Sequence, residues 1–118
     1  MMRIEKVRAW CEELEAGLSQ TFGPDHDAIV DGVNGGWLEA YRLWGGEAYM
    51  VTRVERGVLT CCCYQGARVR EAMRWMRAQC ARLGLTSILF FTARPALARL
   101  LSEFSPQHEQ SVYRVKVA

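Results

Sequence analysis

Residues 58–92 constrain the fold more than any other part of the sequence. Residues 58–64, VLTCCCY, are almost all small or apolar, a pattern typical of a strand that is buried on both faces. A turn containing Gly66 follows, and residues 86–92 contain the apolar run ILFF, which predicts a second strand of the same kind. Between them a helix is predicted over residues 68–83, with an apolar stripe of Val69, Met73, Met76, Cys80 and Leu83. Together these segments predict a right-handed βαβ unit with parallel strands.

The segments on either side predict further strands and helices. Residues 37–44 and 47–55 are rich in aromatic and β-branched side chains, and the Gly45-Gly46 pair between them predicts a tight hairpin. Residues 4–18 repeat apolar side chains at helical spacing, which predicts an amphipathic helix, and a second short helix is predicted over residues 25–33. After the βαβ unit we expect a helix over residues 95–104 and a half-buried strand over residues 111–117.

This order of elements predicts an α+β fold. Its sheet is mixed, because an antiparallel meander leads into one parallel βαβ unit, and helices are expected on both faces. A chain of 118 residues fits one domain over residues 1–118. Within it, residues 1–35 form a helical N-terminal segment and residues 36–118 hold the sheet and the core helices.

Charge and cysteine usage exclude several classes of protein. A formal net charge of +2 is too small to favour nucleic acid as a partner. There is no apolar leader and no apolar run long enough to span a membrane, so we expect a soluble, cytoplasmic protein. Five cysteines, three of them consecutive, fit reduced thiols better than disulfides or a metal site, and we expect no metal.

The predicted order of elements resembles the GNAT superfamily of N-acetyltransferases over residues 36–117, with the first strand absent or unrecognised. The strand, glycine turn, arginine-rich helix, strand and leucine-rich helix of residues 58–104 are the most specific part of this resemblance. Residues 92–101, TARPALARLL, are also similar to small GNAT-like proteins encoded by phages. The resemblance implies that acetyl-CoA is the cofactor.

The resemblance also implies where acetyl-CoA would bind. In this superfamily the turn before the central helix binds the pyrophosphate, and unpartnered amides at a helix N-terminus attract anions in general. The matching residues of this chain are Gln65, Gly66, Ala67, Arg68 and Arg70. The ends of the two parallel strands, at Cys62, Cys63 and Thr92, would hold the pantetheine arm.

The match to the superfamily's phosphate motif is incomplete. That motif is Arg or Gln, two residues, Gly, one residue, then Gly or Ala. Aligned on Gly66, it places Cys63 at its first position and Arg68 at its last. Two interpretations follow, a contracted phosphate-binding turn and a turn that has lost the phosphate site. As a third, Gly66 makes only a strand-to-helix turn and the arginines form a solvated face.

No catalytic residue is identified by the sequence. Residues 58–64 contain no carboxylate to act as a base, and residues 95–104 contain no tyrosine to protonate a thiolate. The glutamates at positions 39, 47 and 55 lie on the earlier strands, and the tyrosines at 64 and 113 are alternatives without an assigned place. The cysteine triplet is better explained by core packing than by nucleophilic chemistry.

Two functions therefore stay open. The first is an acetyl-CoA-dependent N-acetyltransferase, acting on an unknown amine or protein acceptor. The second is a catalytically inactive GNAT-like structural or interaction protein of phage origin. Four tryptophans are many for this length, and they favour a homo-oligomer or a protein partner over nucleic acid.

Overall fold

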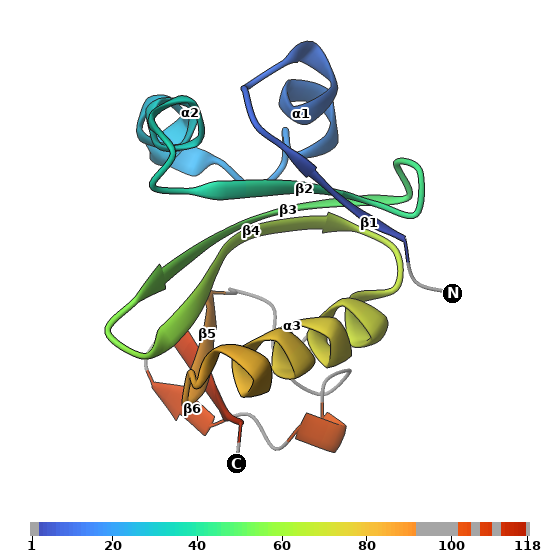
Figure 1. Cartoon of the computed structure of the whole chain (residues 1–118). Coiled ribbons are helices and arrows are strands. Elements are labelled where there is room, and N and C mark those ends of the chain that lie inside the picture. The colour runs from blue at the N-terminus through green and yellow to red at the C-terminus, as the bar shows by residue number, and fades with distance from the viewer. Residues whose placement is uncertain (1–2, 92–101, 105–106, 110–111, 118) are drawn as a thin grey trace. The chain divides into compact units, whose positions relative to one another are not determined.

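The chain is described by a computed structural model over residues 3–91, 102–104, 107–109 and 112–117. Its elements up to the fourth strand are β1 (Ile4–Val7), α1 (Glu12–Gly17), η1 (Gly23–Asp25), α2 (His26–Gly35), β2 (Glu39–Leu43), β3 (Ala48–Glu55) and β4 (Val58–Gly66). The elements after it are α3 (Val69–Leu83), β5 (Ser87–Phe91), η2 (Ser102–Phe104), β6 (Gln107–Glu109) and β7 (Val112–Lys116) (Figure 1).

The strands form a mixed sheet in the order β1-β2-β3-β4-β5-β7-β6. The pair β4–β5 is parallel, and the pairs β1–β2, β2–β3, β5–β7 and β6–β7 are antiparallel. This confirms the predicted α+β fold class, with a meander that leads into one parallel βαβ unit. No helix in the described ranges is long and apolar enough to cross a membrane.

The chain divides into two compact units. Unit 1 comprises Met1–Arg53 and Cys62–Ala67, and unit 2 comprises Val54–Cys61 and Arg68–Ala118. Strands β3 and β4 each contribute residues to both units. The expectation of a single domain over residues 1–118 stays a prediction.

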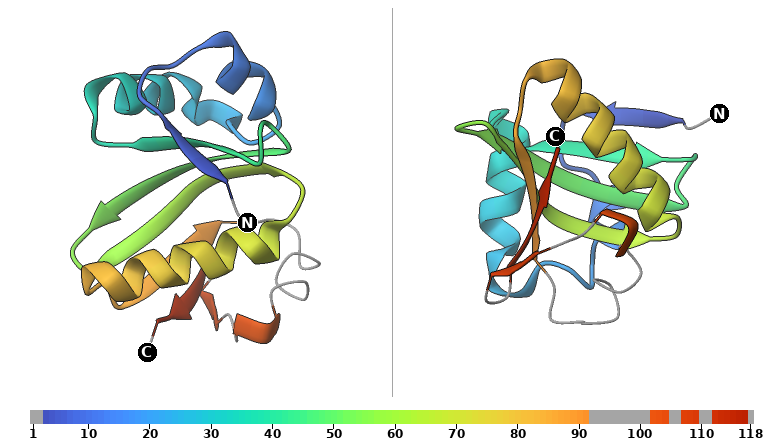
Figure 2. Two further views of the ribbon diagram at one scale, coloured as in Figure 1. Left: turned by 45° about the vertical axis from the view of Figure 1, so that its right-hand side comes forward. Right: turned by 90° about the horizontal axis from the view of Figure 1, so that it is seen from below.

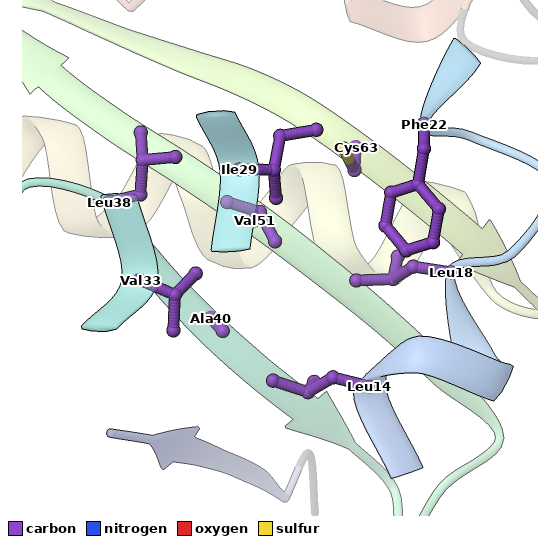
Figure 3. Packing of buried hydrophobic residues seen from close by; sticks show 9 residues of the cluster. All are labelled: Leu14, Leu18, Phe22, Ile29, Val33, Leu38, Ala40, Val51 and Cys63. Carbon is purple, nitrogen blue, oxygen red and sulfur yellow. The ribbon is translucent and has the colours of Figure 1, made fainter. Parts of the chain in front are cut away.

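In unit 1, α1 and α2 lie side by side over one face of the strands β2 and β3 (Figures 1 and 2). Their inward side chains meet one residue from each of β2, β3 and β4 in one apolar cluster (Figure 3). Its members are Leu14, Leu18, Phe22, Ile29, Val33, Leu38, Ala40, Val51 and Cys63. Leu14 with Leu18, and Ile29 with Val33, keep the four-residue spacing of a helix face, as helix-on-sheet packing requires.

In unit 2, α3 packs on β5. Met73, Met76 and Cys80 of the predicted stripe are buried, whereas Leu83, at the last turn, is 61% exposed and does not belong to it. Gly84 ends the helix in the left-handed conformation at φ 74°, as predicted. The register of β4 with β5 runs from Val58↔Ser87 to Cys61↔Phe90, which confirms the predicted parallel pair.

The N-terminal segment differs most from the sequence prediction. The helix expected over residues 4–18 is wrong in its first half, because Ile4–Val7 form the strand β1, paired antiparallel with β2. This is the first strand that the resemblance left absent or unrecognised. The helix α1 begins only at Glu12, and α2 runs two residues further than predicted, to Gly35.

Two further details correct the prediction. The connection of β2 to β3 is not a two-residue hairpin but spans residues 44–47, and Trp44, Gly45 and Gly46 all have positive φ. Strand β6 was not predicted. The helix expected from Pro95 lies mostly outside the described residues, which include only its last turn, η2.

Candidate functional site

The candidate site is the turn between β4 and α3. Gly66, Ala67, Arg68 and Arg70 are exposed, and Gln65 is half-buried. The backbone turns at two positive φ angles, 126° at Gly66 and 60° at Arg68. Only glycine adopts the first of these readily, whereas the second is a left-handed conformation that strains a side chain modestly.

Gly66 is required by the packing of unit 1 itself. A Cβ atom added there would lie 2.4 Å from the carbonyl oxygen of Glu47 and 2.5 Å from the Cα of Ala48. Both are backbone atoms, which cannot rotate away. The glycine is therefore explained by the fold, whether or not a ligand also needs it.

The turn is held in place by three hydrogen bonds within unit 1. The backbone N–H of Gln20 donates to the side-chain oxygen of Gln65 over 2.9 Å. The N–H of Ala67 donates to the carbonyl oxygen of Glu47 over 3.1 Å, and the Tyr64 hydroxyl donates to the Ala67 carbonyl. The Ala67 amide already has an acceptor, so a phosphate would have to use the amides that follow it.

The helix α3 begins without a capping side chain. Its N-cap residue, Arg68, makes no side-chain cap hydrogen bond, and the first bond of the helix runs from the Ala72 N–H to the Arg68 carbonyl. The amides of residues 69–71 precede that bond at the positive end of a 15-residue helix. An exposed ion pair joins Arg68 to Glu71 over 3.8 Å. The first amides of α3 and the exposed Arg68 and Arg70 thus lie at the end of the helix where the dipole favours an anion.

The cysteine triplet lies in β4 and belongs to the packing. Cys61 and Cys63 are buried and Cys62 is half-buried. Burial raises the pKa of Cys63 to about 11 and also raises the pKa of Cys62, so both thiols are neutral at physiological pH. Buried thiols with raised pKa values are poor nucleophiles, and these two fit core packing. Thr92, the third predicted pantetheine contact, lies outside the described residues.

The three glutamates considered as bases from the sequence lie on or beside β2 and β3. Glu39 accepts a hydrogen bond from the Tyr41 hydroxyl over 2.5 Å and lies 3.5 Å from the Lys6 ammonium. Burial, with the Glu39 carboxylate second, raises the pKa of Tyr41. Glu47 and Glu55 are exposed on the connection before β3 and at its far end.

A charged cluster that the sequence did not predict joins α1 to the sheet of unit 1. Glu13 accepts two hydrogen bonds from the Arg42 guanidinium, one of 2.6 Å from Nε, and one of 2.5 Å from the Tyr49 hydroxyl. These bonds, Arg42 first, lower the pKa of Glu13 to about 2. Such a weak base suits a structural anchor and not proton abstraction at neutral pH. Its members are 29 and 36 residues apart, so no local pattern could have revealed it.

Comparison with solved structures identifies the fold of the chain, whereas comparison by sequence finds no match. No protein-family model matches the chain, and no curated protein matches it by sequence. Solved structures do match. A Bacillus subtilis acetyltransferase in complex with CoA has a TM-score of 0.67 and 14% identity, covering 98% of this chain and 97% of that one. The ribosomal-protein-S18-alanine N-acetyltransferase of Escherichia coli has a TM-score of 0.72 and 10% identity, covering 100% and 95%.

A third structure agrees with these two. An IAA acetyltransferase from Bacillus cereus has a TM-score of 0.65 and 13% identity, covering 98% of this chain and 99% of that one. The similarity therefore extends over nearly the whole of both chains in each case. At these identities it is a similarity of fold. The chain has the GNAT fold.

Proposed function

We propose that the protein is an N-acetyltransferase that uses acetyl-CoA. One observation carries this proposal: within a GNAT fold, a glycine turn leads into an uncapped α3 that begins with exposed arginines. Several acetyltransferases share that fold at TM-scores of 0.65 to 0.72. The acceptor amine is not identified by any residue of the chain.

In this proposal the pyrophosphate of acetyl-CoA accepts hydrogen bonds from the first-turn amides of α3. Arg68 and Arg70 add positive charge beside them. Ala67 contributes a small side chain and Gln65 braces the turn, since its oxygen is used by the Gln20 amide. Cys62, Cys63 and Thr92 stay the proposed contacts of the pantetheine arm.

Acetyl-CoA supplies the activated acetyl group, and the protein holds it against an amine. The strand β4 has no carboxylate or histidine along its length, so we assign it backbone donors and acceptors only. Proton removal from the acceptor amine then falls to solvent, and the rate gain comes from positioning and from oriented backbone dipoles.

The second candidate function is a catalytically inactive GNAT-like interaction protein. It is favoured by the packing around Gly66, which explains that glycine without a ligand. The lack of a carboxylate or histidine on β4 agrees with it. The two candidates differ in whether CoA is bound.

Calorimetry with acetyl-CoA and with free CoA separates them. Gly66 is unsuitable for substitution, because a side chain there would disrupt the fold. Arg68→Gly is suitable, since glycine fits φ 60° without strain, and it should weaken CoA binding about tenfold by removing one charge-assisted contact. Arg70→Ala should act similarly.

Arg82→Ala is the matched control, because it removes the same charge from the far end of α3. The Arg82→Ala variant should bind CoA with the same affinity as the unchanged protein. Micromolar binding that Arg68→Gly weakens and Arg82→Ala does not would support the enzyme. If millimolar CoA gives no heat and no protection from unfolding, the enzyme proposal fails.

A further inference from the structure

Trp37 is the most exposed large apolar residue in the described part of the chain. Its side chain is 62% exposed in unit 1, directly after α2. Its backbone is nevertheless fixed by the end of that helix. Gly36 has φ 87°, its N–H donates to the carbonyl of Val33, and the Trp37 N–H donates to the carbonyl of Gly32 over 3.1 Å. This pair of hydrogen bonds is the Schellman motif, and it fixes the backbone position from which the Trp37 side chain extends.

The indole ring itself is seated on glycine. A Cβ atom added to Gly35 would lie 1.9 Å from the Trp37 Cζ3, and one added to Gly32 would lie 3.1 Å from its Nε1. Any side chain at position 35 would therefore displace the ring. Gly32 and Gly35 thus leave room for the indole to lie against α2, while the ring stays largely open to solvent.

The position of the Trp37 ring affects the entropy that it would lose when a partner binds. Most exposed side chains lose rotamer freedom when a partner binds them, at about 0.5–1.5 kcal/mol each. Here the ring already lies against Gly35 and Gly32, so we expect less of that freedom to be lost on binding. Pre-ordered tryptophans of this kind are typical of the residues that dominate binding at interfaces.

The charge around this ring indicates what it would bind. Asp31 is exposed and lies one helical turn before Gly35, on the same side of α2, and Asp27 lies one turn before that. Residues 9–41 contain seven carboxylates and no lysine or arginine, although Glu13, Glu15 and Glu39 are paired with Arg42, His26 and Lys6. The exposed Asp31 favours a cationic partner over an anionic one such as nucleic acid. A cation can stack on the face of an indole.

We propose that Trp37, with Asp31 one helical turn before Gly35, is a docking surface for an arginine side chain of a basic peptide segment. The guanidinium is planar and weakly hydrated, so it stacks on the indole while it pairs with a carboxylate. The surface lies within unit 1 and uses no residue of the β4–α3 turn. The proposal therefore does not depend on acetyl transfer.

The test follows the indole N–H signals of the protein by NMR during titration with a blocked peptide, acetyl-Gly-Arg-Gly-Arg-Gly-amide. Trp37→Phe identifies the Trp37 signal among the four tryptophans. We expect that signal to shift at millimolar peptide and the other three to stay unchanged. The same peptide with citrulline in place of arginine has nearly the same shape without charge, and it should produce no shift.

Three variants test the surface, and the first of them tests its geometry separately from its chemistry. Gly35→Ala keeps the tryptophan but displaces the ring, and Gly35 is helical without positive φ, so the helix should accept alanine. We expect Gly35→Ala and Trp37→Leu each to weaken peptide binding about threefold to fivefold, and Asp31→Asn about twofold. Far-ultraviolet circular dichroism confirms that each variant is folded.

Equal shifts of several indoles, or equal affinity of the citrulline peptide, would overturn the proposal. So would unchanged peptide affinity in a folded Gly35→Ala protein. The blocked peptide has no free amine and cannot be an acetyl acceptor. Its result therefore stands apart from the calorimetry with CoA, and either proposal can fail alone.

Discussion

The two compact units carry opposite charge. Unit 1 contains five lysines and arginines against nine aspartates and glutamates, whereas unit 2 contains ten against four. The overall charge of +2 conceals this difference, because the two sets nearly cancel. A total charge therefore says little about which ligands a small protein can attract, and the charge of each unit says more.

The units also use their charges differently. In unit 1 the carboxylates take part in packing, since Glu13 joins α1 to Arg42 of β2 and Glu15 joins α1 to His26 of α2. In unit 2 the arginines lie on the exposed side of α3, where Arg74 pairs with Glu103 and Arg77 stacks on Phe104. Ionisation should therefore influence the stability of unit 1 more than that of unit 2.

The largest expected difference between the units concerns one glycine from each. Gly66→Ala should destabilise the protein by about 3 kcal/mol or more, because it combines an unfavourable φ with a clash against the backbone of β3. Gly84→Ala also has positive φ, but no atom lies within 4 Å of the added carbon, so about 1 kcal/mol is expected. Urea unfolding measures both. Equal losses would contradict the close packing at Gly66.

The next largest effect concerns the anchor of α1. Glu13→Gln should cost about 1 kcal/mol at pH 7, because it replaces a charge-assisted pair that is partly open to solvent. The folded-state pKa of Glu13, about 2, lies below the ordinary value of 4.5. Its stabilisation is therefore present above pH 4.5 and is lost as the pH falls towards 2.

Unfolding of both proteins at pH 7 and at pH 2.5 tests this. The difference between Glu13 and its glutamine variant should shrink at the lower pH. A difference that stays constant would show that the carboxylate charge contributes nothing to the anchor.

In unit 2 the ion pair of Arg74 with Glu103 should contribute less to stability than Glu13 does in unit 1. Arg74→Ala removes an ion pair of 2.9 Å to Glu103, but the partners are 54% and 43% exposed. We expect a loss of about 0.5 kcal/mol, decreasing in 0.5 M NaCl. A loss as large as that of Glu13→Gln would remove the contrast between the units.

The smallest effect concerns His26, whose two ring nitrogens lie 2.7 Å from Glu15 and 2.9 Å from Asp27. Both contacts can be hydrogen bonds only in the imidazolium form. They raise the pKa of His26, the Glu15 bond most. Their stabilisation is therefore present below the unfolded pKa of 6.5 and is lost as the pH rises through the raised folded value.

NMR titration of His26 against the Glu15→Gln variant tests this effect. The pKa of His26 should fall in the variant. An unchanged titration would show that the two residues are not paired in solution.

The central part of the fold was predictable because its signals are local and strong. The apolar strand β4, the stripe of α3 and Gly84 after it specify a βαβ unit without knowledge of anything distant. Gly66 was recognised for the same reason. The packing role of Gly66 was not predictable, because the sequence cannot show that Glu47 and Ala48 lie against it.

The ends of the chain were predicted less well, for a physical reason. Ile4 and Val7 are three residues apart, which fits a helix face as well as a short strand. Only the pairing of Ile4 with Leu43, 39 positions further along the chain, makes the segment a strand. Strand β6 has the sequence Gln-His-Glu and no apolar signal at all, so its pairing with β7 alone defines it.

The cysteines have a practical consequence for studying this protein. Cys11 is exposed at the start of α1, whereas Cys61, Cys63 and Cys80 are buried and Cys62 is half-buried with a raised pKa. A maleimide dye at neutral pH should therefore modify Cys11 first, without any engineered mutation. One fluorophore at a known place in the acidic unit would then report peptide docking and acid unfolding in the native sequence.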